Sequence, residues 1–170
     1  QFEVLGTDGS FGMKDEVLVT KRERSVSLWD TQSGFSLRDI DNSRSRLYGY
    51  YLSRNGSKML TIKDDRMSIW DLNSRVRISS IDTNFAAMQI SKVVFAGDGE
   101  RAVLGTYDNK IFYWAAGDRK IHRLSDMGDS IYALSITEDG SLLAVGDAAG
   151  GLALYSFMSN PPLWFNHAHD

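Results

Sequence analysis

Short alternations of apolar and polar residues recur along the chain, and each of them contains an aromatic residue near its end. An alternation with a period of two, rich in β-branched and aromatic residues and bounded by turn-forming residues, predicts a β-strand. The aromatic residues lie 41, 44 and 41 positions apart, which is the kind of fixed spacing that indicates structural repeats. The four alternations are VSLWD (26–30), MSIWD (67–71), KIFYW (110–114) and LALYSF (152–157).

Each repeat holds further strand-like segments, and turn-forming residues separate them. Asx-Gly pairs give a second marker with nearly the same spacing, 43 and then 41 residues, at Asn55-Gly56, Asp98-Gly99 and Asp139-Gly140. The pattern therefore predicts about four strands per repeat and no long helix. The remaining predicted strands are 16–20 and 35–40 in the first repeat, 47–53, 58–62 and 76–81 in the second, 90–95, 101–106 and 120–124 in the third, and 131–136 and 141–146 in the fourth.

The first strands of the last three repeats share one register. Leu47, Tyr50 and Leu52 are spaced by three residues and then two, and the same spacing recurs from Ile90 and from Ile131. The second strands, for example AVLG at 102–105, are almost wholly apolar, as expected of strands that pack on both faces. The inner strands should therefore lie between neighbouring sheets.

These residues resemble the WD-repeat β-propeller family, through Trp29-Asp30, Trp70-Asp71, Trp114 and the Asx-Gly turns on a period of about 40–45 residues. The resemblance implies an all-β propeller of about four four-stranded antiparallel blades, at about 1–42, 43–83, 84–126 and 127–170, in one partial domain over 1–170. Rings of this family hold about seven blades, so we expect other segments or a complementing subunit to supply the rest. The resemblance implies structural roles for Trp29, Asp30, Asp64, Trp70, Asp71, Asp108, Trp114 and Tyr155.

The chain departs from the family pattern in its polar residues. The Gly-His dipeptide that precedes the first strand in the family has no counterpart here, and Tyr155 replaces Trp in the fourth repeat. A turn acid persists six residues before the tryptophan in each of the first three repeats, as Glu23, Asp64 and Asp108. A buried indole N–H needs an acceptor, and we expect backbone carbonyls or these turn carboxylates to provide it.

Composition and charge narrow the class of protein. The chain of 170 residues has no Cys, which excludes disulfides and thiolate chemistry, and no apolar run of about 20 residues that would cross a membrane. Residues 1–80 carry 13 basic and 11 acidic side chains, whereas 81–170 carry 6 and 11, for net charges of +2 and −5. A nucleic-acid surface needs a denser basic stripe. We expect an intracellular, cytoplasmic protein that binds neither membrane nor nucleic acid.

No motif for catalysis or for a cofactor stands out. The Gly-rich segment 146–151 lacks the Lys-Ser/Thr of a phosphate loop and is interpreted as a hairpin turn. His167 and His169 are interpreted as part of a tail rather than as metal ligands. The sequence therefore favours a protein with no enzymatic activity, no cofactor and no metal.

The expected function is protein–protein interaction, as a scaffold or as a docking or sensing module of a larger assembly. The alternatives are the sensor portion of a multidomain enzyme, such as a nucleotide-driven switch ATPase, and nucleic-acid binding through the basic first half. In the family, partners contact the loops that enter the first strand and the turns before the Trp strand. The residues expected there are Arg46, Tyr48, Arg66, Gln89, Ser91, Tyr107, Ser130 and Tyr132.

Overall fold

Sixteen β-strands and no α-helix make up the described part of the chain in the computed structural model. The structure describes residues 8–13, 15–40, 45–64, 66–82, 89–97, 99–156 and 164–165. The first eight strands are β1 (Asp8–Gly12), β2 (Val17–Lys21), β3 (Val26–Asp30), β4 (Ser36–Ile40), β5 (Leu47–Leu52), β6 (Lys58–Lys63), β7 (Arg66–Asp71) and β8 (Val76–Asp82). The second eight are β9 (Ile90–Phe95), β10 (Arg101–Thr106), β11 (Lys110–Ala115), β12 (His122–Asp126), β13 (Ile131–Ile136), β14 (Leu142–Asp147), β15 (Leu152–Ser156) and β16 (Trp164–Phe165).

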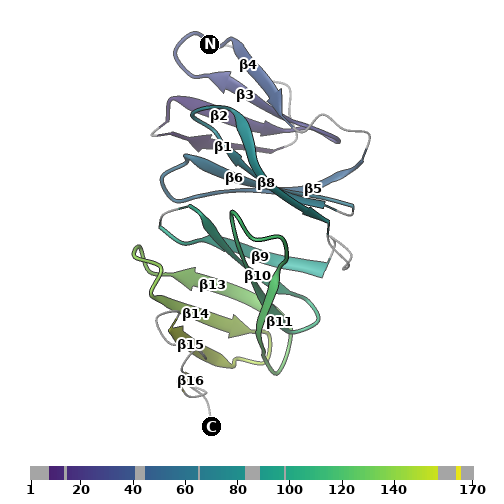
Figure 1. Ribbon diagram of the computed structural model, residues 1–170, viewed down its shortest axis with the longest axis vertical. Helices are drawn as coiled ribbons and strands as arrows, with labels where there is room; N and C mark the ends of the chain where they lie inside the picture. Colours follow the sequence, from purple (N-terminus) through teal and green to yellow (C-terminus); the bar gives the residue numbers. More distant parts are fainter. Residues whose placement is uncertain are drawn as a thin grey trace. The chain divides into compact units, whose positions relative to one another are not determined.

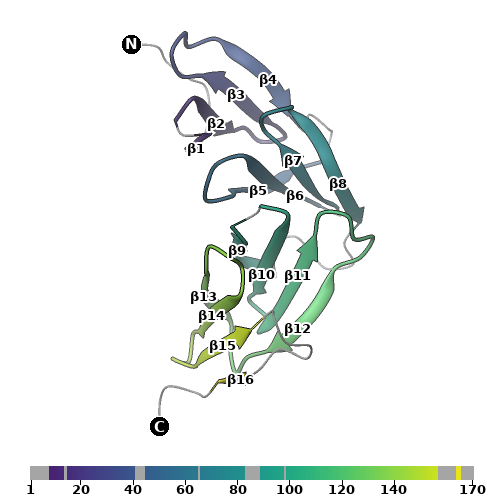
Figure 2. The same cartoon turned by 60° about the vertical axis from the view of Figure 1, so that its left-hand side comes forward.

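The strands form four antiparallel sheets, each made of four consecutive strands in sequence order (Figure 1). The predictions of an all-β chain and of four strands per repeat are confirmed. The chain divides into two compact units, residues 1–87 and 88–170, with two sheets each. We call them the N-terminal and C-terminal units. In the N-terminal unit, the first strands β1 and β5 lie on one side and the fourth strands β4 and β8 on the other (Figure 2).

The sequence pattern missed one strand at each end of the chain. β1 has the sequence DGSFG, whose two glycines disfavour a strand. It nevertheless pairs with the whole of β2, from Asp8 opposite Lys21 to Gly12 opposite Val17. The partner strand, rather than the propensity of β1 itself, determines this structure. The two-residue β16 pairs with β15 and is too short to leave a periodic signal.

A β-bulge explains the three-residue spacing in the first strands. The pairing of β5 with β6 shifts between Leu47 and Gly49, so Tyr48 is an extra residue without an opposite partner. The same shift makes Ser91 the extra residue of β9 and Tyr132 that of β13. A bulge changes the direction in which the strand presents its side chains. The apolar residues on either side of it can therefore both face the core.

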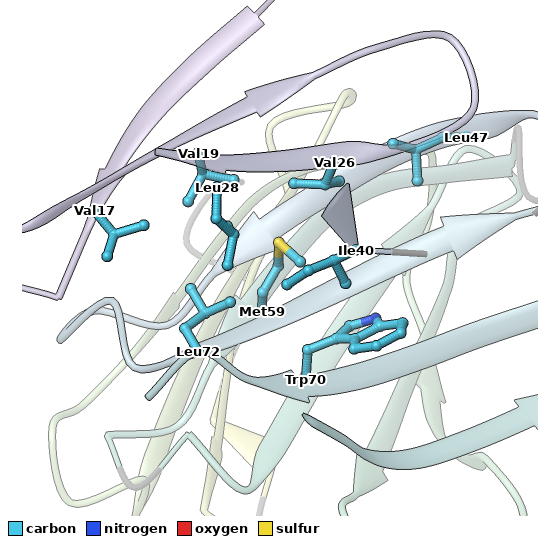
Figure 3. Close-up of a cluster of buried hydrophobic side chains, with 9 residues drawn as sticks. All are labelled: Val17, Val19, Val26, Leu28, Ile40, Leu47, Met59, Trp70 and Leu72. Atoms are coloured by element: carbon cyan, nitrogen blue, oxygen red, sulfur yellow. The ribbon is translucent and has the colours of Figure 1, made fainter. Parts of the chain in front are cut away.

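The core of the N-terminal unit lies between its two sheets. Val19 and Leu28 of the first sheet are fully buried and point toward Met59 and Leu72 of the second sheet (Figure 3). Burying a Val or Leu side chain completely stabilises a protein by about 1.5–3 kcal/mol. The inner strand β6 is buried at every position after Lys58, which confirms that it packs on both faces.

The C-terminal unit has an equivalent core between the β9–β12 and β13–β16 sheets. Val103, Ile111, Ile131 and Val145 are buried there, and so is Tyr155, which replaces the tryptophan of the other repeats. The hydroxyl of Tyr155 lies 3.7 Å from the Met127 sulfur, and burial raises the pKa of this phenol. An aromatic core side chain is thus retained even where the indole is lost.

The indole N–H groups find acceptors that differ from our expectation in two of three repeats. Trp29 donates to the Thr20 hydroxyl over 2.8 Å, and Trp70 donates to the Thr61 hydroxyl over 2.9 Å. The expectation of a carbonyl or carboxylate acceptor is wrong for both, because a threonine two residues beyond the cross-strand partner reaches the ring nitrogen. It is confirmed for Trp114, which donates to the Asp118 carbonyl over 3.1 Å.

The acids after Trp29 and Trp70 close the turns to the fourth strands. Asp30 accepts hydrogen bonds from the amide and hydroxyl of Ser33, which lower the pKa of Asp30. Asp71 does the same with Ser74. Partial burial raises the pKa of Asp71. Hydrogen bonds from Lys58 and Ser74 together lower this pKa by more than burial raises it, so the net shift is downward.

The glycines of the Asx-Gly pairs adopt the left-handed conformation that these turns require. Gly56, Gly99 and Gly140 have φ of 67°, 70° and 70°. At the last of these turns, Asp139 accepts hydrogen bonds from Thr137 and Ser141, and these lower the pKa of Asp139 to about 2. Asp98 lies outside the described residues.

Gly105 permits close packing of the two C-terminal sheets, and its replacement provides a test. A Cβ at Gly105 would lie 2.4 Å from the Ile131 Cγ2, whereas a Cβ at Gly117 would meet nothing within 4 Å. We predict that Gly105→Ala lowers the free energy of unfolding by about 1–3 kcal/mol because it overpacks the core. Gly117→Ala, the matched control, should change it by less than about 0.5 kcal/mol. Urea denaturation measures both; equal effects would contradict this packing.

Candidate functional site

Most of the residues expected to bind a partner lie at one edge of their sheets. We call it the entry edge, by which we mean the end of the strands, not an outer strand: it is where the first strand begins and where the turn joins the second strand to the third. The bulge residues Tyr48, Ser91 and Tyr132 are the second residues of their first strands, so they lie beside this edge. Because a bulge redirects a side chain, it can turn Tyr132, which is exposed, away from the core.

In the C-terminal unit, two predicted residues form an exposed aromatic pair. Tyr107, in the turn after β10, and Tyr132 have ring centroids 6.0 Å apart and ring planes at 70°. This is the edge-to-face geometry that aromatic rings favour. The side chains are 50% and 54% exposed, respectively. We call them the tyrosine pair.

Two further predicted residues, Gln89 and Ser130, hold the backbone of Tyr107. The Tyr107 amide donates to the Gln89 carbonyl over 2.8 Å. The Ser130 hydroxyl donates to the Tyr107 carbonyl over 2.6 Å, and the Ser130 carbonyl accepts from the Ala148 amide over 2.9 Å. Both polar backbone groups of Tyr107 are therefore fixed. The turn closes at Asn109, whose φ of 63° suits a three-residue hairpin loop.

Acidic side chains surround this surface, and some of them already have basic partners. Asp108 pairs with Lys110, and hydrogen bonds from Lys110 and Thr106 lower the pKa of Asp108. Asp126 pairs with Arg123.

Asp129 and Asp147 differ from these two acids. Asp129 accepts from the Ser130 amide, and Asp147 accepts from the Ala149 and Gly151 amides. Neither forms an ion pair with any residue that the structure describes. Asp129 and Asp147 therefore carry negative charge at the entry edge, and no described Lys, Arg or His side chain forms an ion pair with either of them.

In the N-terminal unit, the entry edge holds an arginine beside the bulge tyrosine. The Arg46 guanidinium carbon lies 5.4 Å from the centroid of the Tyr48 ring, within the range of a cation–π contact. The Arg46 amide donates to Asp64 over 3.1 Å. Arg46, Tyr48 and Asp64 thus form one cluster.

Lysines connect this cluster to the preceding sheet. Lys21 donates to the Tyr48 carbonyl over 2.8 Å, and Lys63, which is only 3% exposed, donates to the Arg24 carbonyl over 2.8 Å. These two bonds cross between the two sheets in opposite directions. They hold the entry edge of the N-terminal unit in place.

Arg66 and Ser91 are the remaining residues that were predicted to bind a partner. Arg66 forms an exposed ion pair with Asp82 over 3.0 Å, and its Nε donates a hydrogen bond to the same carboxylate. The Ser91 hydroxyl oxygen is buried without a hydrogen-bond partner among the described residues. Sequence reasoning did not single out the exposed apolar residues at the fourth strands, Phe35, Val76 and Ile78. Ile78 is the extra residue of a second bulge, between β7 and β8. The alternation of apolar and polar residues along β8 is the sequence signal that could have identified it.

Metal and membrane sites were also considered. In the part of the chain that the structure describes, no three His, Asp or Glu side chains lie close enough to hold a metal ion. His167 and His169 lie outside that part. None of the described residues forms a helix long and apolar enough to cross a membrane.

The chain was compared with known proteins. No protein-family model matches it, and no curated protein is similar to it in sequence. The assignment of a function therefore depends on the geometry of the chain itself.

The Arg46–Tyr48–Asp64 cluster gives a pH-dependent test. Hydrogen bonding to Asp64, together with burial, raises the pKa of Tyr48 above its ordinary value of 10.0, while the Arg46 charge lowers it in part. The folded chain therefore keeps this proton to higher pH than the unfolded chain. Its contribution to stability is complete below about pH 10 and is lost as the pH rises through the raised pKa.

We predict that Asp64→Asn brings the pKa of Tyr48 down toward 10 and that Arg46→Gln raises it. Titration of the Tyr48 Cζ resonance by ¹³C NMR, assigned with Tyr48→Phe, measures both shifts. If neither substitution moved the titration midpoint, the cluster would not exist in solution.

Proposed function

We propose that the chain is a divergent WD-repeat β-propeller segment, with its four sheets as blades of a larger ring of about seven. The support is the period near 41–44 residues, the four-stranded sheets in sequence order and the Trp–Thr hydrogen bond in two repeats. Other segments of the same protein, or a complementing subunit, would supply the remaining blades. The cytoplasm is the proposed compartment.

We further propose that the chain is a non-catalytic docking module that binds another protein at the entry edge of its C-terminal unit. The observation that carries this proposal is the tyrosine pair: two half-exposed aromatic rings, with the backbone of Tyr107 fixed by hydrogen bonds. Tyrosine is enriched among the residues that dominate protein–protein binding energy. A fixed backbone also reduces the ordering cost of association.

Site-specific photo-crosslinking in the cells that produce the protein tests this proposal. A benzophenone amino acid would replace Tyr132 in the full-length protein. Leu142, which is 36% exposed at the opposite edge of the same sheet, would be the matched control position. We predict a discrete protein adduct from position 132 that is absent from position 142.

A second arm checks that the adduct depends on the tyrosine pair. Tyr107→Ala, combined with the crosslinker at position 132, should reduce the adduct at least about fivefold, since loss of a binding hot spot costs more than about 1 kcal/mol. Adducts of equal yield at 132 and 142, or none at 132, would contradict docking at this edge.

A further inference from the structure

We propose that the tyrosine pair, together with Asp129 and Asp147, binds an arginine side chain in a basic segment of a partner protein. This inference rests on the proposed docking function and specifies the chemistry of the partner. It is drawn from a comparison of the two units with each other.

The N-terminal unit contains the interaction that we propose for the partner. There, Arg46 lies directly before the first core residue, Leu47, and its guanidinium lies over the ring of the bulge residue Tyr48. The Asp64 carboxylate accepts a hydrogen bond from the Arg46 amide and interacts with the Tyr48 hydroxyl. This entry edge therefore supplies its own arginine to its own tyrosine and carboxylate.

The C-terminal unit has the bulge tyrosine but not the arginine, and its carboxylates hold other positions, with Asp147 opposite Ile131 where the N-terminal unit has Lys63 opposite Leu47. Ser130 stands directly before Ile131, in the position that Arg46 holds before Leu47. The Ser130 hydroxyl bonds to the Tyr107 carbonyl and so fixes the turn. The bulge residue Tyr132 then remains 54% exposed. An arginine from another chain could contact this ring as Arg46 contacts Tyr48.

Asp129 and Asp147 belong to the same entry edge as Tyr132. Asp147 is opposite Ile131 in the ladder, next to the bulge at Tyr132. Asp129 is adjacent to Ser130, which contacts Tyr107. Neither carboxylate has an ion-pair partner among the described residues. A carboxylate can accept several hydrogen bonds, so each retains capacity for a guanidinium donor.

Charge and shape favour arginine in a protein over other occupants. Residues 81–170 carry 6 basic and 11 acidic side chains, which would repel phosphates of nucleic acid and acidic peptides. A guanidinium is planar, stacks on aromatic rings and bonds carboxylates with two parallel N–H groups, which an ammonium cannot do. The edge-to-face tyrosines and the two acids match these properties.

NMR of the full-length protein, ¹⁵N-labelled within these 170 residues, tests the inference. The probe is a capped peptide, Gly-Ser-Arg-Gly-Arg-Ser-Gly, and the control is the same peptide with citrulline, the neutral isostere of arginine. We predict that the arginine peptide shifts the amide resonances of Tyr107, Ser130, Tyr132 and Asp147, with an affinity at least about fivefold above that of the citrulline peptide.

Matched variants connect the shifts to this surface. Tyr132→Leu and Asp129→Asn should each weaken the arginine peptide about two- to fivefold. Glu138→Gln removes the same charge at the opposite edge of the β13–β16 sheet and should leave the affinity unchanged. The amide resonances of β10 and β14 report whether each variant keeps its fold.

Equal shifts with both peptides, shifts with neither, or equal shifts with a single-stranded oligonucleotide would each overturn the preference for arginine. The crosslinking experiment is independent of these results. An adduct at position 132 without arginine binding would leave docking intact and reject only the proposed partner chemistry.

Discussion

The structure depends on the burial of the inner strands on both of their faces. β6 and β10 are buried at nearly every position, so side chains on both faces of these two strands are covered. Within each unit one neighbouring sheet provides apolar surface, through Leu28 and Met59 in the first unit and through Ile111 and Leu143 in the second. The repeat in the sequence is the consequence, because every sheet must present similar apolar faces.

The bulge at the start of the first strand connects this packing to the proposed function. It lets Ile131 stay fully buried while the next residue, Tyr132, turns to the surface beside Tyr107. Gly105 contributes because it lets Ile131 approach the neighbouring sheet closely. The exposure of the tyrosine pair therefore depends on how the core packs beneath it. At the entry edge of the N-terminal unit, the corresponding tyrosine, Tyr48, contacts Arg46 of the same chain.

Much of this architecture could be predicted from the sequence, because period-two alternation and Asx-Gly turns are local signals. These signals predict the interior strands and the register that the first strands share from Leu47, Ile90 and Ile131. β1 could not be predicted, since its glycine-rich sequence depends on β2 for its structure. The threonine acceptors of Trp29 and Trp70 also required cross-strand geometry, as did the edge-to-face contact of Tyr132 with a residue of another sheet.

The central claim is that the fold holds Tyr107 and Tyr132 together as a preorganised surface. Nuclear Overhauser effects between their ring protons test it most directly, in a chain with selectively labelled tyrosine and assignments from Tyr107→Phe and Tyr132→Phe. The account predicts clear cross-peaks between the two rings, consistent with centroids 6.0 Å apart, and weaker ones in Ser130→Ala, which frees the Tyr107 carbonyl. Two rings without mutual cross-peaks in the folded chain would contradict it.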